Sequence, residues 1–228
     1  LAPTSSVLAP PARIDHIRVI DRDTGAGGDY ECYDALERIE AHLQSATPKY
    51  EYVNLSLGPD LPVEDDEKNA WTSTLDEVVG QSGMLLCCAA GNSGEQDAEA
   101  MLNRIQPPSD GVNVLSVGAC DSPDDNWRRS SYSSVGPGRT PGVAKPDGVI
   151  FGGAFERPFG VVSTASEGLS ATQGTSFASP LALRSAVSAG VITEAGRLDP
   201  LSIRALMVHT AEAGEGPAEE TGWGRFQS

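Results

Sequence analysis

The stretch Gly174-Thr175-Ser176-Phe177-Ala178-Ser179-Pro180 places a serine between small residues at the predicted start of a helix. A helix N-terminus carries a partial positive charge, which favours the negative charge that develops around an attacking oxygen. The small neighbours of Ser176 leave room for a substrate backbone to approach. These are the surroundings that a serine nucleophile needs, and an ordinary helix start is the alternative interpretation.

Apolar runs alternate with amphipathic segments along the rest of the chain. Residues 84–90 form a continuous apolar run, the pattern of a strand covered on both faces. In the first helical segment, apolar residues recur at helical spacing, at Ala35, Leu36, Ile39 and Leu43. The predicted strands are residues 14–20, 52–57, 84–90, 112–119, 149–150 and 161–163. The predicted helices are residues 31–45, 68–82, 98–104, 175–191 and 199–213.

This alternation predicts an α/β fold with three layers, in which a mostly parallel, doubly wound sheet lies between helices on both faces. No internal repeat interrupts the pattern, so we expect residues 1–228 to form a single domain, with residues 1–12 as a loop or linker. The chain begins at Leu1 rather than at a methionine and ends without a recognisable stop. We therefore expect both ends to be cut from a longer protein.

The composition excludes some partners. The formal net charge is −16 and the sequence pI is about 4.4, whereas nucleic acids and anionic membranes require basic patches. No apolar run approaches membrane-spanning length and no signal peptide is visible. The four cysteines show neither metal-ligand spacing nor a C-x-x-C motif, so we expect buried free thiols. They are Cys32, Cys87, Cys88 and Cys120.

A second candidate group follows the apolar run. Ligands of such sheets bind beyond the carboxyl ends of the strands, where Gly91 and Asn92 lie. The side-chain amide of Asn92 at this place can donate a hydrogen bond to an oxyanion. Asn and Gly are also common turn residues, so a plain turn is the alternative.

The pattern G-T-S-x-A-x-P resembles the nucleophile segment of the subtilisin-like serine peptidases, the subtilases. The resemblance runs from about Ile14 to Arg225, and residues 89–94 resemble the oxyanion segment with Asn92 at the donor position. It implies a serine endopeptidase that acts through an acyl-enzyme and needs no cofactor. Ser176 would attack the scissile carbonyl of a peptide or protein substrate, and Asn92 with the Ser176 N–H would hold the oxyanion.

The resemblance also implies a substrate-binding surface. Residues 54–58 resemble a wall of the specificity pocket, and Pro107-Pro108 resembles an X-Pro step that is commonly cis and puts Gln106 near the pocket floor. The alternatives are a strand that ends at a turn glycine and a surface turn. The implied residues are Ser56, Leu57, Gly58, Ala89, Ala90, Gly91, Gln106, Pro108, Gly174 and Thr175. Residues 131–137 and 222–224 are also family-like, but no chemistry is assigned to them.

The general base is missing from the matched segments. Subtilases supply an Asp from a D-[ST]-G turn and a His from an H-G-T-H-type helix, both N-terminal to these segments, and no H-G-x-H occurs here. Asp23-Thr24-Gly25 resembles the Asp turn, but only one predicted helix separates it from residue 54, so we interpret Asp23 as a turn residue. We interpret His16, His42 and His209 as structural. A missing N-terminal segment of the same protein is therefore expected to supply the Asp and the His, which leaves this chain inactive alone.

Three other interpretations remain. Ser176, Asp199 and His209 have the chain order of an α/β-hydrolase triad, but that fold expects G-x-S-x-G and position 178 is Ala. Asp199-Pro200 is explained more simply as a helix start. The full protein could instead be a pseudoprotease that binds peptides without cutting them, or a structural domain of a larger assembly.

Calcium and the compartment are left open by the sequence. Subtilases often bind calcium, and acidic loops occur at residues 60–67 and 121–125, but neither has a recognisable ligand spacing. Solvated loops are therefore the simpler interpretation. The family resemblance is compatible with secretion or a periplasmic location, and the free thiols are compatible with the cytoplasm.

Overall fold

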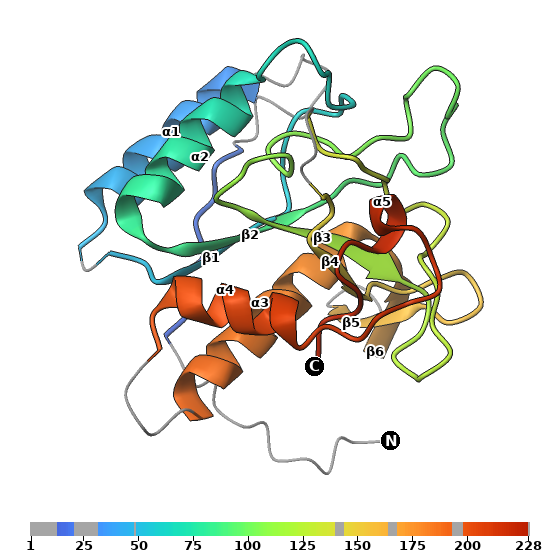
Figure 1. Cartoon of the computed structure of the whole chain (residues 1–228). Coiled ribbons are helices and arrows are strands. Elements are labelled where there is room, and N and C mark those ends of the chain that lie inside the picture. The colour runs from blue at the N-terminus through green and yellow to red at the C-terminus, as the bar shows by residue number, and fades with distance from the viewer. Residues whose placement is uncertain are drawn as a thin grey trace.

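A four-stranded parallel sheet lies at the centre of the computed structural model, which describes residues 13–20, 32–47, 49–139, 144–163, 168–192 and 198–227. Its strand order is β1-β2-β3-β4. Helices α1 and α2 cover one face and α3 and α4 the other, which gives three layers (Figure 1). The strands are β1 (Tyr52–Leu55), β2 (Leu85–Ala89), β3 (Leu115–Cys120) and β4 (Gly148–Phe151). The helices are α1 (Cys32–Ser45), α2 (Ala70–Ser82), α3 (Thr175–Ile192) and α4 (Pro200–His209).

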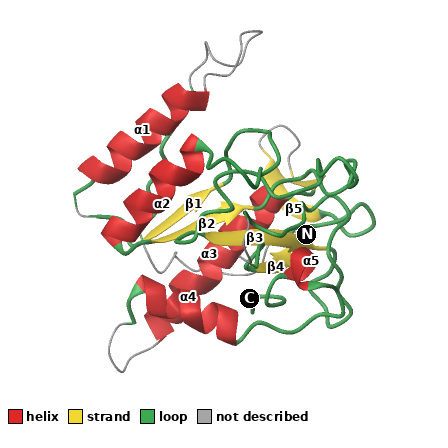
Figure 2. Ribbon diagram, turned by 45° about the horizontal axis from the view of Figure 1, so that its top comes forward, coloured by secondary structure: helices red, strands yellow, loops and turns green. Residues whose placement is uncertain are grey.

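Strand β2 corresponds to the apolar run of residues 84–90, and it is covered on both faces as predicted. Leu85 and Cys87 pack into the cluster on the α3 and α4 side, and Leu86 and Cys88 pack into the cluster on the α1 and α2 side. Alternate side chains of a strand point to opposite faces, so a strand between two helical layers needs apolar residues at every position. The predicted α/β fold is confirmed, and Figure 2 shows the helices on both sides of the strands, with loops around β3 and β4.

The helix boundaries follow local capping. Helix α2 begins after Asn69, whose side chain accepts a hydrogen bond from the N–H of Trp71 at 2.9 Å. It ends at Gly83, which adopts a left-handed φ of 71°. Helix α4 begins after Asp199 with Pro200 in its first turn, as predicted. None of the described helices is both long and apolar enough to cross a membrane.

Two predicted elements are wrong. Residues 14–20 form no strand, because alternation alone gives the backbone no hydrogen-bonded neighbour, and Ile14 is 76% exposed. The segment lies against the first helix instead, where Arg38 donates to the carbonyl of Val19 at 2.9 Å. Residues 98–103 form turns rather than a helix, and Arg104 forms an isolated β-bridge with Val135. Met101 has a φ of 56°, which ends the helical conformation, and such a short helix nucleates poorly.

Three elements in the C-terminal half were predicted only in part or not at all. Strand β5 (Phe159–Ser163) was expected near residues 161–163, and it pairs in antiparallel fashion with β6 (Gly168–Thr172), which was not expected. The sequence of β6 has few β-branched or aromatic residues and its side chains are exposed or half-buried, so it carries no apolar pattern. The short helix α5 (Ala218–Thr221) was also missed.

The buried thiols lead to a testable prediction. Cys87, Cys88 and Cys120 are free and buried, and burial raises the pKa of Cys88 and of Cys120 to about 12 and that of Cys87 further. At pH 8 we expect a thiol reagent such as Ellman's to modify the native protein only at the half-buried Cys32, and all four cysteines after unfolding. Rapid modification of two or more thiols in the native state would contradict this expectation.

The same pKa shifts fix the sign of a pH effect. The native state retains thiol protons that the unfolded chain, with an ordinary pKa near 8.5, releases. The free energy of unfolding is therefore expected to fall as the pH rises above about 9, since the unfolded state then binds fewer protons than the native state. Urea unfolding at pH 8 and pH 10 measures this difference.

Candidate active site

The candidate groups meet at the carboxyl ends of the central strands. Residues 56–58 follow β1, residues 90–92 follow β2, and Ser176 is the second residue of α3. Parallel strands place these ends at one edge of the sheet, and α3 packs across β1, β2, β3 and β4. Residues that are up to 125 positions apart in sequence therefore come into contact.

Asn92 is held by the residue that precedes the candidate nucleophile. Its Oδ1 atom accepts hydrogen bonds from the backbone N–H of Thr175 at 2.9 Å and from the Thr175 hydroxyl at 3.1 Å. The same hydroxyl accepts from the N–H of Gly91 at 3.2 Å. Since Oδ1 is occupied, Nδ2 is the atom of Asn92 that remains to donate. Asn92 is exposed, so an incoming group can reach this amide.

Ser176 is half-buried and its own donors are free within the described part of the chain. Its Oγ and its backbone N–H make no hydrogen bond with any described residue. The N–H groups of a first helical turn have no partner within the helix, so this N–H can accept a ligand oxygen as its partner. The carbonyl of Ser176 accepts from Ser56 Oγ at 3.2 Å, which fixes the helix start to the end of β1.

A short polar chain continues this connection between α3 and β1. Ser179 Oγ donates to Asn54 Oδ1 at 2.7 Å, and Asn54 Nδ2 donates to Ser56 Oγ at 3.1 Å. Ser179 is fully buried, so the hydrogen bond also satisfies a hydroxyl in the protein interior. The end of β1 and the start of α3 are thus joined by hydrogen bonds between residues that lie far apart in the sequence.

The implied pocket residues also come together. The Pro107-Pro108 bond is cis, as the resemblance led us to expect. Gly58 lies against this step so closely that a Cβ atom would come within 2.2 Å of the Pro107 carbonyl oxygen. The side chain of Gln106 lies 2.5 Å from the position of a Cβ atom on Gly91 and therefore fills the space beside that glycine.

Gln106 is fixed in this place by its own hydrogen bonds. Its Nε2 atom donates to Asp60 Oδ1 at 2.6 Å and to Ser93 Oγ at 2.9 Å, and its N–H donates to the Ala90 carbonyl at 2.9 Å. Ala89 is half-buried and Ala90 is buried, at the end of β2. Leu57 differs from the others, because its side chain packs against the core cluster beneath α1 and α2.

No described residue is placed as a base for Ser176. His16 is exposed in the segment before α1, and His42 Nε2 lies 3.0 Å from the hydroxyl of Tyr50. His209 is exposed at the end of α4, where it lines a surface hollow with Asp147 and Trp223. Asp23, Thr24 and Gly25 lie outside the described residues. None of the three histidines forms a hydrogen bond with Ser176.

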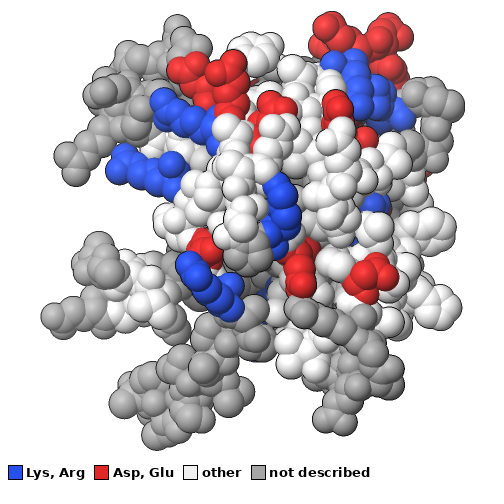
Figure 3. Space-filling model, turned by 90° about the vertical axis from the view of Figure 1, so that its left-hand side faces the viewer, with Lys and Arg blue, Asp and Glu red and all other residues white. Residues whose placement is uncertain are grey.

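The described residues contain no candidate metal site. No group of three or more His, Cys, Asp or Glu side chains comes close enough to hold a metal ion, and this includes the acidic loops of residues 60–67 and 121–125. On the face shown in Figure 3, Lys and Arg side chains lie interspersed with Asp and Glu.

Comparison with known proteins identifies the family. The sequence profile of the Subtilase family matches residues 3–224, and the chain belongs to this family. No curated protein sequence matches the chain significantly. Among solved structures, the prenylagaramide maturation protease PagA is similar with a TM-score of 0.65 and 20% identity, over 86% of this chain and 65% of that one.

Two further solved structures show the same fold. The patellamide maturation protease PatA matches with a TM-score of 0.65 and 22% identity, over 85% of this chain and 65% of that one. The PatG macrocyclase in complex with peptide matches with a TM-score of 0.62 and 14% identity, over 87% of this chain and 54% of that one. The chain thus spans less than two thirds of the length of these structures.

Proposed function

We propose that this chain carries the nucleophile and the oxyanion hole of a serine endopeptidase and lacks the base that would make it active alone. The observation that supports this most strongly is the pair of hydrogen bonds from Thr175 to Asn92 Oδ1. They occupy Asn92 Oδ1, and within the described residues Asn92 Nδ2, the Ser176 N–H and the Ser176 hydroxyl have no hydrogen-bond partner. Preorganised donors of this kind stabilise the negative oxygen of a tetrahedral intermediate.

In this mechanism, Ser176 Oγ attacks the scissile carbonyl of a peptide and an acyl-enzyme forms as the amine leaves. A His removes the proton from Oγ and returns it to the leaving nitrogen, while an Asp orients the His. Both would come from sequence upstream of Leu1, since no described histidine contacts Ser176. The residues at the ends of β1 and β2, with Gln106 and Pro108, would bind the peptide.

The direct test compares two polypeptides: this chain, and a longer one that includes the upstream sequence, here called the extended protein. Both are incubated with a mixed peptide library and the products are identified by mass spectrometry. We expect the extended protein to cleave peptides and the 228-residue chain to cleave none. Peptide binding without cleavage by the extended protein would favour the pseudoprotease alternative.

Replacing the candidate oxyanion donor should weaken turnover strongly. In the extended protein, Asn92→Ala is expected to lower kcat by about 10²–10³-fold and to change KM little, because the amide acts on the oxyanion rather than on the bound substrate. Steady-state kinetics with one peptide measure both constants. The control is Asn103→Ala, whose side chain makes no hydrogen bond with the described residues. An unchanged kcat for Asn92→Ala would contradict the assigned role.

Gln106 is expected to limit the size of the side chain that precedes the scissile bond. Gln106→Gly would empty the space beside Gly91 and should raise the preference for phenylalanine over alanine at that position about tenfold or more. Matched peptides measure the ratio of the two kcat/KM values. Asn103→Ala, which leaves Gln106 and its hydrogen bonds to Asp60 and Ser93 in place, is the control, and an unchanged ratio for Gln106→Gly would contradict the prediction.

A further inference from the structure

A loop segment of residues 129–135, here called the bracing segment, contacts the turn that carries Asn92 on both sides of that residue. The N–H of Gly94 donates to the Tyr132 carbonyl at 2.8 Å, and the N–H of Ser134 donates to the Gly91 carbonyl at 3.0 Å. Ser134 Oγ accepts from the N–H of Ser93 at 2.9 Å. The position of the Asn92 turn therefore depends directly on the bracing segment.

The same segment reaches the turn that precedes Ser176 through one side chain. The hydroxyl of Tyr132 accepts a hydrogen bond from the N–H of Gly174 at 3.1 Å. Its proton is shared between the carbonyls of Gly152 at 3.0 Å and Gly153 at 2.8 Å. Gly174 has a left-handed φ of 150° and comes two residues before Ser176, so its orientation affects the start of α3.

Tyr132 is thus a single residue with one hydrogen bond to each turn. Its carbonyl binds Gly94 and its hydroxyl binds Gly174, and the two turns carry Asn92 and Ser176. Tyr132 is 8% exposed and belongs to the main core cluster, which also contains Ala119 and Ala178. A phenylalanine at this position would fill the same space in the core. The Tyr132 hydroxyl therefore adds only its hydrogen bonds, to Gly152, Gly153 and Gly174.

The bracing segment is itself rigidly held. Arg129 Nη1 donates to the carbonyls of three residues in the segment, Ser130 at 3.2 Å, Ser131 at 2.9 Å and Ser133 at 2.7 Å. Ser133 Oγ accepts from the N–H of Ala119 in β3 at 3.0 Å. Burial also raises the pKa of the Tyr132 hydroxyl, so it stays protonated where peptidases are assayed.

We propose that Tyr132 is a positioning residue that sets the separation of Asn92 and Ser176 by joining their two turns. The proposal rests on the proposed function, because the separation matters only if the two residues act on one carbonyl. A misplacement of about 1 Å in such a pair can cost up to 10²-fold in rate. The family-like motif of residues 131–137 has no assigned chemistry, and it is the Tyr132 hydroxyl that connects it to the turn before Ser176.

The test compares Tyr132→Phe with Tyr50→Phe. Tyr50 also loses a hydroxyl that contacts two side chains, His42 and Asp15, but it lies away from both turns. In the extended protein we expect Tyr132→Phe to lower kcat about tenfold with KM within twofold, and Tyr50→Phe to match the wild type. Equal kcat values for Tyr132→Phe and the wild type, or equal falls for both variants, would overturn the proposal.

A second measurement separates this proposal from the proposed function. In ¹⁵N-labelled samples of the 228-residue chain, Tyr132→Phe is expected to shift the amide signal of Gly174 and the side-chain amide signals of Asn92. Tyr50→Phe should leave both unchanged. Unshifted Asn92 signals in Tyr132→Phe would overturn the positioning role. If the extended protein cleaves no peptide, the proposed function fails, while these signals still decide whether Tyr132 sets the place of Asn92.

Discussion

Ser176→Ala is expected to abolish peptide cleavage by the extended protein, with a fall in kcat of about 10⁴-fold or more and little change in KM. The substitution removes the only atom that can form the acyl-enzyme and leaves the oxyanion donors and the peptide-binding residues in place. Turnover is measured with the peptide that the wild type cleaves fastest, by following product formation over hours.

The control for this variant lies on the same helix. Ser185 is half-buried in α3 and its Oγ donates only to the carbonyl of Leu181, at 3.3 Å. Ser185→Ala is expected to keep the activity of the wild type. Two results would contradict the role given to Ser176: more than a tenth of the wild-type rate in Ser176→Ala, or a loss in Ser185→Ala of the same size.

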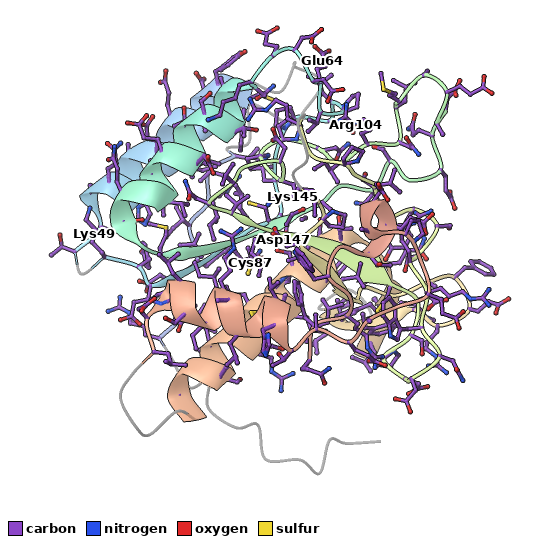
Figure 4. The ribbon with its side chains drawn as sticks, viewed as in Figure 1. Lys49, Glu64, Cys87, Arg104, Lys145 and Asp147 are labelled. Atoms are coloured by element: carbon purple, nitrogen blue, oxygen red, sulfur yellow. The ribbon has the colours of Figure 1, made fainter. Side chains whose placement is uncertain are left out.

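Lys145→Met is expected to destabilise the fold by about 3–5 kcal/mol, because it removes one partner of a buried ion pair. The Nζ atom of Lys145, a residue only 1% exposed, donates to Asp147 Oδ2 at 2.7 Å and to the Val114 carbonyl at 3.0 Å. Figure 4 shows Lys145 and Asp147 between the layers, whereas Lys49 lies at the outer edge.

The loss is large because Asp147 stays buried without its main cation. Its Oδ2 keeps the N–H of Ser116 at 2.7 Å, and Arg204 Nη2 lies 3.5 Å from Oδ1. For a domain of this size each kcal/mol lowers the melting temperature by about 2–4 °C, so the expected fall is about 6–20 °C. The free energy of unfolding of both variants is measured by urea unfolding. Lys49→Met, at an exposed position, should lower it by less than about 1 kcal/mol. A Lys145→Met variant within 1 kcal/mol of the wild type would contradict the prediction.

A second variant tests the cause of this loss. In Lys145→Met/Asp147→Leu the unpaired carboxylate is gone, so the double variant is expected to be more stable than Lys145→Met alone. If it is less stable than the single variant, the buried charge is not the reason for the destabilisation.

Much of the fold was predictable because its layers impose periodic patterns on the sequence. The apolar run of β2 and the four apolar positions of α1 correspond to faces that are buried in the structure. Residues 14–20 carry a strand-like alternation without a paired neighbour, and β6 is paired without carrying the alternation. Local pattern fails where backbone pairing, rather than the burial of one apolar face, decides whether a segment is a strand.

The sequence motifs mark the candidate residues of the site, but not the hydrogen bonds that join them. Ser176 and Asn92 stand in recognisable motifs, whereas the hydrogen bonds between Asn92 and Thr175 join residues 83 positions apart. Lysine is almost never fully buried unless it is paired, so the residue type at position 145 does not indicate a core residue. Tyr132 lies in a motif to which no chemistry was assigned, and only the folded chain brings its hydroxyl to Gly174.

The central claim is that Ser176 has its oxyanion hole in this chain and its base outside it. Reaction with a fluorophosphonate tests this most directly, because the reagent modifies a serine whose hydroxyl is activated by a base. Mass spectrometry locates the adduct in the 228-residue chain and in the extended protein under the same conditions. We predict modification of Ser176 in the extended protein only. Rapid modification of Ser176 in the 228-residue chain, or none in either polypeptide, would contradict the account.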